Sequence, residues 1–186
     1  MQTWESIRAA CESCTACPLC KTRKNIVFGR GNETASVMFI GEAPGESEDL
    51  TGLPFVGRAG KLLDVMLSYV DITPDDIYIA NILKCRPPRN RDPLPEEEEA
   101  CIGFLRMQTA LLRPKIIVCL GRIAAKRIIG EDFKITRDRG KWYERNGVRV
   151  TAVYHPAALL RDPSKKGDTL IDLKAIADAA GIKPAD

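Results

Sequence analysis

The stretch 36-SVMFIGEAPGESEDLTGLPFVGRAG-60 joins a short apolar run to a loop rich in glycine and carboxylates. A continuous apolar run such as residues 36–40 is typical of a strand that is buried on both faces of a sheet. Further β-like runs span residues 77–82, 115–120 and 148–154. Helical spacing of apolar residues marks the segments 60–70, 95–112, 121–129 and 168–180.

This alternation of β and α patterns predicts an α/β fold, with an open, mostly parallel sheet and helices on both faces. Ligands of such sheets bind beyond the carboxyl ends of the strands. The loops after Ile40, Ile79 and Tyr154 are therefore the expected places for a functional site. The sequence shows no internal repeat or linker, and we expect one domain over residues 1–186.

The composition is that of an ordinary globular protein, with 45% hydrophobic and 28% charged residues. No apolar run approaches the ~18–20 residues of a membrane span. The first residues, MQTWESIR, lack the basic-then-apolar order of a secretion signal. We therefore expect a cytoplasmic protein with no membrane partner.

The net charge of +3 is too small to indicate a nucleic-acid partner by itself, but the basic residues are clustered. Solvated basic loops are the alternative for any one cluster. The three clusters are Lys84, Arg86, Arg89 and Arg91; Arg137, Arg139 and Lys141; and Arg161, Lys165 and Lys166. The acidic run 96–99 follows Pro95 and indicates a helix start, where carboxylates favour the positive end of the dipole.

Seven cysteines are many for a reducing compartment, where disulfides are rare. The first four are spaced three apart, at Cys11, Cys14, Cys17 and Cys20, and Cys85 and Cys101 follow much later. Cys119 lies inside an apolar run, where a free buried thiol is expected. A Cys-x-x-Cys pair with two distant cysteines suits either zinc or a 4Fe-4S cluster, and the spacing does not choose between them.

The only histidine, His155, follows an apolar run and precedes Pro156. A lone histidine is more often structural than catalytic, but its place at a strand's carboxyl end favours a functional role. Leu159, Leu160 and Arg161 follow it closely. The two leucines could be core residues, or an apolar wedge inserted between bases with the arginine on phosphate.

Three segments together carry a resemblance: residues 41–60, 81-NILKCRPPRNRDP-93 and 154-YHPAALLR-161. In order and spacing they resemble the motifs of family 4 uracil-DNA glycosylases, which carry an iron–sulfur cluster. The resemblance covers the chain from Cys14 to about Arg161. It implies a three-layer α/β/α fold with a central four-stranded parallel sheet and an N-terminal segment that binds the cluster.

The resemblance also implies a ligand set for the 4Fe-4S cluster, which falls on Cys14, Cys17, Cys85 and Cys101. Cys11 and Cys20 match no ligand position. The flipped uracil would stack on Phe55 of the PFVG segment and would be read by Asn81, and His155 would stabilise the leaving uracil anion. Residues brought close to the base and its sugar by the first motif are Gly41, Glu42, Ala43 and Gly45, with Glu48 nearby.

These residue types suit the reaction. Cleavage of the N-glycosidic bond leaves negative charge on uracil O2, which a donor from His155 stabilises. The amide of Asn81 offers a donor and an acceptor for uracil O4 and N3–H, a pattern that cytosine reverses. At Ala43 the best-known uracil-DNA glycosylases have an Asp that positions water. Glu42 or Glu48 could orient the water instead, or the sugar cation could react unaided.

We therefore expect a monofunctional hydrolase that flips uracil from single- or double-stranded DNA and leaves an abasic site, acting as a monomer. The expected DNA contacts are Arg86, Arg89, Arg91, Leu159, Leu160 and Arg161. One alternative is a nucleotide-binding enzyme, since Gly52 and Gly57 have phosphate-loop spacing, but Arg58 and Ala59 stand where that motif needs Lys and Ser or Thr. The other is a non-enzymatic iron–sulfur module for DNA binding or redox, which leaves Phe55, Asn81 and His155 unexplained.

Overall fold

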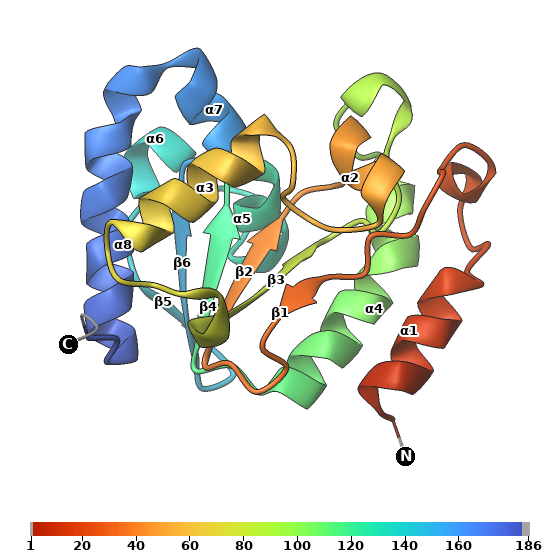
Figure 1. Cartoon of the computed structure of the whole chain (residues 1–186), viewed down its shortest axis with the longest axis horizontal. Coiled ribbons are helices and arrows are strands. Elements are labelled where there is room, and N and C mark those ends of the chain that lie inside the picture. Colours follow the sequence, from red (N-terminus) through yellow and green to blue (C-terminus); the bar gives the residue numbers. More distant parts are fainter. Residues whose placement is uncertain (1, 184–186) are drawn as a thin grey trace.

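The computed structural model describes residues 2–183 as a central sheet between two layers of helices (Figure 1). The strands are β1 (Arg30–Gly31), β2 (Val37–Gly41), β3 (Ile77–Asn81), β4 (Ile116–Leu120), β5 (Tyr143–Arg145) and β6 (Val148–Val153). The helices are α1 (Trp4–Glu12), α2 (Glu46–Thr51), α3 (Arg58–Ser68), α4 (Pro95–Leu112), α5 (Arg122–Ile128), α6 (Ile135–Asp138), α7 (Pro156–Arg161) and α8 (Lys166–Ala180). Short 3-10 turns lie at Pro18–Lys21, Pro74–Asp76, Pro88–Asn90 and Pro163–Lys165.

The sheet has the strand order β1-β3-β2-β4-β6-β5. Its four central strands are parallel, and β1 and β5 pair antiparallel at the two edges. The predicted α/β class and the central parallel strands are thus confirmed, but the prediction of only four strands was wrong. The two edge strands have two and three residues, too short to show an alternating or continuous apolar pattern.

Apolar residues explain the layers. Every residue of β2, β3 and β4 is buried, as expected for strands covered on both faces. On one face, Met38 and Ile40 pack with residues of α4 and α5, and α1 lies against α4. On the other face, Val37 and Phe39 pack with residues of α3, α7 and α8. Successive residues of β2 thus serve opposite cores.

The carboxyl ends of the four parallel strands all point to the same end of the sheet, which we call its carboxyl edge, toward α2, α5 and α7 (Figure 1). Strand β3 lies on one side of β2 and β4 on the other, so the strand order reverses between β2 and β4. This topological switch point is where ligands of open α/β sheets bind. No helix within residues 2–183 is long and apolar enough to cross a membrane.

Candidate functional site

Four residues that the sequence predicted as a site lie together at the carboxyl edge of the sheet, and we call them the base site: Gly41, Phe55, Asn81 and His155. Gly41 ends β2 and is the register partner of Asn81, which ends β3. A methyl group on Gly41 would lie 2.3 Å from Asn81 Oδ1 and 2.6 Å from Phe55 Cζ. The rings of Phe55 and His155 are 5.9 Å apart, tilted by 35°. A side chain at position 41 would therefore displace Asn81 and Phe55.

Phe55 is held in a conformation that a bulky residue rarely adopts, with φ at +54°. Arg30 fixes the chain there by donating to the carbonyl oxygens of Pro54, at 3.0 Å, and Phe55, at 3.4 Å. Gly60 makes room, since a Cβ on it would lie 1.9 Å from the Phe55 carbonyl oxygen. Backbone strain that surrounding contacts maintain is common at functional sites.

Glu48 binds the loop rather than facing a substrate. One carboxylate oxygen accepts from the backbone N–H groups of Val56 and Gly57, at 2.9 and 2.8 Å, and the other accepts from Gly45, at 3.1 Å. A Cβ on Gly45 would lie 2.8 Å from that second oxygen and would displace the carboxylate. Because both oxygens of Glu48 accept bonds from backbone N–H groups, its geometry suits the positioning of Phe55 better than the orientation of water.

The side chain of Glu42, unlike that of Glu48, is not held by hydrogen bonds to the described residues. Glu42 follows Gly41 and is half-buried, and within residues 2–183 its side chain makes no hydrogen bond. Burial, together with the nearby charge of Asp92, raises the pKa of Glu42 to about 7. Glu42 is thus a carboxyl with a raised pKa and no hydrogen-bond partner among the described residues, next to Gly41 in the chain, and such groups are common at functional sites.

His155 caps α7 and is oriented by that role. Its Nδ1 accepts from the backbone N–H of Ala157 at 3.1 Å. Burial, with the nearby positive charge of Arg161, lowers the pKa of His155 to about 4. The ring is therefore neutral near pH 7, and because Nδ1 is an acceptor its single proton is on Nε2. Gly121 leaves room for the ring, since a Cβ there would lie 2.8 Å from His155 Cβ.

Asn81 has an unused hydrogen-bonding atom. Its side chain is 2% exposed, and its Oδ1 has no partner. Among the described residues only Thr151 Oγ1 shares this state. A buried amide oxygen without a partner costs about 1–3 kcal/mol, so it marks a place where a ligand donor is missing. This oxygen adjoins Phe55, which makes a flat ring with an N–H group a fitting occupant.

The proposed wedge of leucines has to be corrected. Residues 156–161 form helix α7 rather than a loop, because His155 caps the helix and Pro156 occupies its first position. Leu159 is 0% exposed and packs in the core beneath α3 and α8. Leu160 is exposed, as is Arg161. Only Leu160 is placed to meet a partner, so the interpretation of both leucines as a wedge was wrong for Leu159.

The cysteines other than Cys119 line one small cavity between the N-terminal segment, the segment after β3 and the start of α4: Cys11, Cys14, Cys17, Cys20, Cys85 and Cys101. Arg23 donates to Cys85 Sγ at 3.4 Å, and the backbone N–H of Lys84 donates to Cys101 Sγ at 3.3 Å. Cys119 is buried in β4, as the sequence predicted. No group of His, Cys, Asp or Glu within residues 2–183 is arranged to hold a single metal ion.

The basic segment 84–91 is only partly free to bind a partner. Arg91 pairs with both oxygens of buried Glu97, at 2.6 and 2.9 Å, and so fixes the loop to α4. Arg86 donates to Asn90 Oδ1 at 2.7 Å. Arg89 is exposed with φ at +55°. Lys84 is buried, so it belongs to the interior and not to a basic surface.

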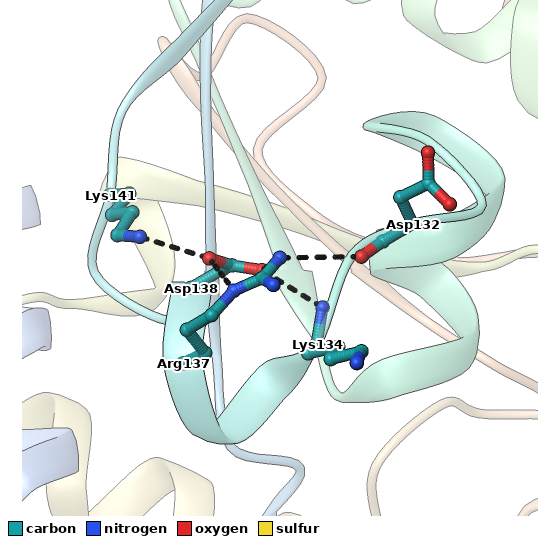
Figure 2. A network of polar contacts seen from close by, with 5 residues as sticks. All are labelled: Asp132, Lys134, Arg137, Asp138 and Lys141. Carbon is teal, nitrogen blue, oxygen red and sulfur yellow. Dashed lines mark hydrogen bonds and ion pairs between the residues drawn. The ribbon is translucent and has the colours of Figure 1, made fainter.

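The second basic cluster is bound by acidic residues. Figure 2 shows Asp138 accepting from Arg137, Lys141 and the backbone N–H of Lys134, at distances between 2.6 and 3.0 Å. The Arg137 guanidinium holds the pKa of Asp138 well below its usual range. Arg139 pairs with Asp168 and Asp172 on α8. These contacts fix the segment between α6 and β5 and reduce its positive charge.

Several residues of the site have no counterpart in the sequence predictions. Gly121 could have been found, since a glycine directly after a buried strand marks a close approach at the carboxyl edge. Arg30 and Gly60 act only through the backbone of Phe55, and no local pattern indicates such contacts. Lys84 belongs to a basic cluster of the sequence, and that pattern does not indicate its burial.

Comparison with known proteins gives the class to which this fold and site belong. The family model of the uracil DNA glycosylase superfamily matches residues 28–176, and the chain belongs to that superfamily. It is 48% identical to the type-4 uracil-DNA glycosylase of Archaeoglobus fulgidus, with 98% of this chain and 96% of that protein covered. The type-4 enzyme of Thermotoga maritima is 45% identical, over 87% of this chain and 85% of that protein.

A type-5 uracil-DNA glycosylase of Pyrobaculum aerophilum is a more distant relative, 33% identical over 69% of this chain and 64% of its own length. The type-4 relatives thus cover more of the chain, at higher identity, than this type-5 enzyme does.

Proposed function

We propose that this protein removes uracil from DNA by hydrolysis of the N-glycosidic bond, as a monofunctional type-4 uracil-DNA glycosylase. The observation that carries the proposal is the unpaired, buried Oδ1 of Asn81 beside Phe55 and His155. The names and coverage of the type-4 relatives support the same function. The free base and an abasic site are the products.

Recognition of the base uses Asn81 and Phe55. A uracil turned out of the DNA stack loses its stacking partners, and the Phe55 ring replaces one of them. The unpaired Oδ1 accepts from uracil N3–H, and the amide NH₂ group donates to O4. Cytosine presents an acceptor at N3 and a donor at C4, so it would leave the buried amide unpaired. Gly41, Ala43 and Gly45 let the backbone approach the base and sugar.

Bond cleavage uses His155. As C1′–N1 breaks, negative charge develops on uracil O2, and the N–H on Nε2 of the neutral imidazole donates to that oxygen. The Ala157 N–H holds the other ring nitrogen and so fixes the direction of the donor. A neutral donor needs no proton from solvent, and the base departs as an anion.

Water attack on the sugar cation uses Glu42. Its carboxyl is free of hydrogen bonds to the described residues, whereas Glu48 is fully used by the loop. Ala43, which replaces the Asp of the best-known relatives, has no group that could bind water. We assign the orientation of the water to Glu42 and the positioning of Phe55 to Glu48.

The cysteine cavity fits a 4Fe-4S cluster better than zinc. Each thiolate of such a cluster binds a different iron atom, so its ligands lie farther apart than those around one ion, consistent with the absence of a single-ion site in residues 2–183. Cys14, Cys17, Cys85 and Cys101 would hold it, and Arg23 and the Lys84 N–H would donate to its thiolates. We propose that the cluster stabilises the fold and supplies no step of the hydrolysis.

We further propose that the protein is a cytoplasmic monomer with one domain, and that basic and apolar side chains near the base site contact DNA. Arg86, Arg89, Leu160 and Arg161 stay as candidates because their side chains are not fully buried. Arg91 is better assigned to holding the loop, since its guanidinium binds Glu97. Uracil in single-stranded and in double-stranded DNA are both suitable substrates.

An oligonucleotide with one uracil tests the proposal. The protein is incubated with the labelled strand, alone and in a duplex, and abasic sites are then cleaved with alkali. Strand breaks at the uracil are expected, and a strand with thymine at that position serves as the control. Absence of cleavage at uracil would contradict the glycosylase function and favour a non-enzymatic iron–sulfur module.

A further inference from the structure

Lys84 is a buried lysine for which the proposed chemistry gives no role. It is 1% exposed, and its ammonium nitrogen donates to three oxygens: Asn81 O at 2.9 Å, Gln108 Oε1 at 2.7 Å and Phe28 O at 3.3 Å. An ammonium group has three N–H donors, and three acceptors match it completely. Such a network is costly to bury unless every member is satisfied.

The rest of the network is also buried. Gln108, which is 0% exposed, donates to the Phe28 carbonyl at 2.9 Å and to Tyr78 Oη at 3.3 Å. Lys84 is thus fixed between α4, β3 and the segment before β1. Of its three contacts, the one with Asn81 reaches the base site.

The segment 81–85 connects the base site to the cysteine cavity. It begins at Asn81 and ends at Cys85, a proposed cluster ligand. Between them, Ile82 N–H donates to the Gly41 carbonyl and Leu83 N–H to the Glu42 carbonyl, each at 3.0 Å. The Lys84 N–H donates to Cys101 Sγ at 3.3 Å. One residue, Lys84, therefore bonds a cavity cysteine through its backbone and the base-reading residue through its side chain.

We propose that Lys84 is a positioning residue for base recognition, which fixes the backbone of Asn81 so that the Asn81 amide meets the uracil edge. This inference rests on the proposed function. The Asn81 carbonyl is at the end of β3, where the ladder stops, and the Lys84 ammonium is its donor. Without that donor the buried carbonyl turns toward another partner and carries the Asn81 side chain with it.

Double-mutant cycles separate this role from a general loss of stability. Lys84→Met keeps the length and removes the donors, and it is combined with Asn81→Ala and, in a second cycle, with His155→Ala. Single-turnover uracil release is measured for each, and visible absorbance and iron content report the cluster. Tyr78→Phe, at the far end of the network from Asn81, is the matched control.

Lys84→Met is expected to lower the rate of uracil release about tenfold. The same substitution should lower the rate little in the Asn81→Ala background, but again about tenfold in the His155→Ala background. Cluster absorbance and the activity of Tyr78→Phe stay at the wild-type level. Binding of an oligonucleotide with 2′-fluorinated deoxyuridine, whose glycosidic bond resists hydrolysis, weakens in parallel with the rate.

If Lys84→Met lowers the rate by the same factor in the Asn81→Ala and the His155→Ala backgrounds, the proposal is overturned. Full activity of Lys84→Met would also overturn it. If Lys84→Met does not fold, Lys84→Gln replaces it, because its amide is one bond shorter and has two N–H donors in place of three. The same pattern of losses in the two cycles is then expected, and full activity of Lys84→Gln in that case would overturn the proposal. Loss of the cluster in both variants would also overturn the proposal, because Lys84 would then serve the cysteines and not Asn81. No uracil release by the wild type would instead contradict the proposed function.

Discussion

The base site and the cysteine cavity lie at the two ends of the segment 81–85, and they are held in different ways. Protein contacts hold the base site: Glu48 binds three backbone N–H groups, and Arg30 binds two carbonyl groups around Phe55. In the cavity, two hydrogen bonds reach the cysteine sulfurs, from Arg23 and from the Lys84 backbone. The base site is therefore preorganised by contacts within the chain, whereas the cavity has few such contacts and would be held chiefly by the proposed cluster.

The largest expected effect is at the base site itself. His155→Ala should lower the rate of uracil release by about 10²–10³-fold, because it removes the donor to the developing anion. Single-turnover rates on a uracil oligonucleotide measure this effect. His155→Asn is the matched control, since its side chain still caps α7. Equal activity of His155→Ala and wild type would exclude the proposed donor.

The next effect concerns the cavity. Cys85→Ser should lose iron, lower the yield of folded protein, and lower the melting temperature by roughly 10 °C, because a ligand that ties the N-terminal segment to the sheet is gone. Iron analysis and thermal unfolding measure these changes. Cys20 lines the same cavity but is not a proposed ligand, so the Cys20→Ser variant is the control and should keep its iron. Iron retained in Cys85→Ser would contradict the ligand set.

Glu48→Gln tests whether the loop is preorganised. An amide presents only one oxygen to the three backbone donors, and each bond to a charged group contributes about 1.5–3 kcal/mol. We expect a lower melting temperature and a slower rate with the cluster intact. Glu46→Gln, an exposed neighbour on α2, is the control and should change neither. A stable but inactive Glu48→Gln would indicate a direct catalytic role.

The smallest effect is in pH dependence. Burial raises the pKa of Glu42 to about 7 from 4.5, so the folded protein holds this proton more tightly than the unfolded chain. Wild type should lose stability relative to Glu42→Gln as pH rises through this range, by at most about 3 kcal/mol. The rate of uracil release by the wild type should rise with pH up to about 7, because the ionised Glu42 carboxylate orients the water. The rate of Glu42→Gln should be low and independent of pH. Unfolding free energies and rates from pH 5 to 8 test both.

The sequence predicted the central parallel strands because buried strands are continuous apolar runs, and this pattern placed a site at the loops after Ile40, Ile79 and Tyr154. The resemblance to the motifs of family 4, and not the strand pattern, singled out Phe55, Asn81 and His155. The sequence could not predict β1 and β5, which are two and three residues long. It left open whether Leu159 is a core residue or part of a wedge, and it could not predict that Glu48 binds the loop. These outcomes depend on contacts between segments far apart in the chain, and local patterns do not encode them.

The identity of the base released in a single turnover tests the proposed function of the base site most sharply. Excess protein is mixed with a strand that carries one uracil among the four normal bases, and the small-molecule product is identified by mass spectrometry. We expect free uracil alone, with an abasic strand, and a loss of uracil release in Asn81→Ala. Release of cytosine or thymine at a similar rate, or no release of any base, would contradict the proposed function.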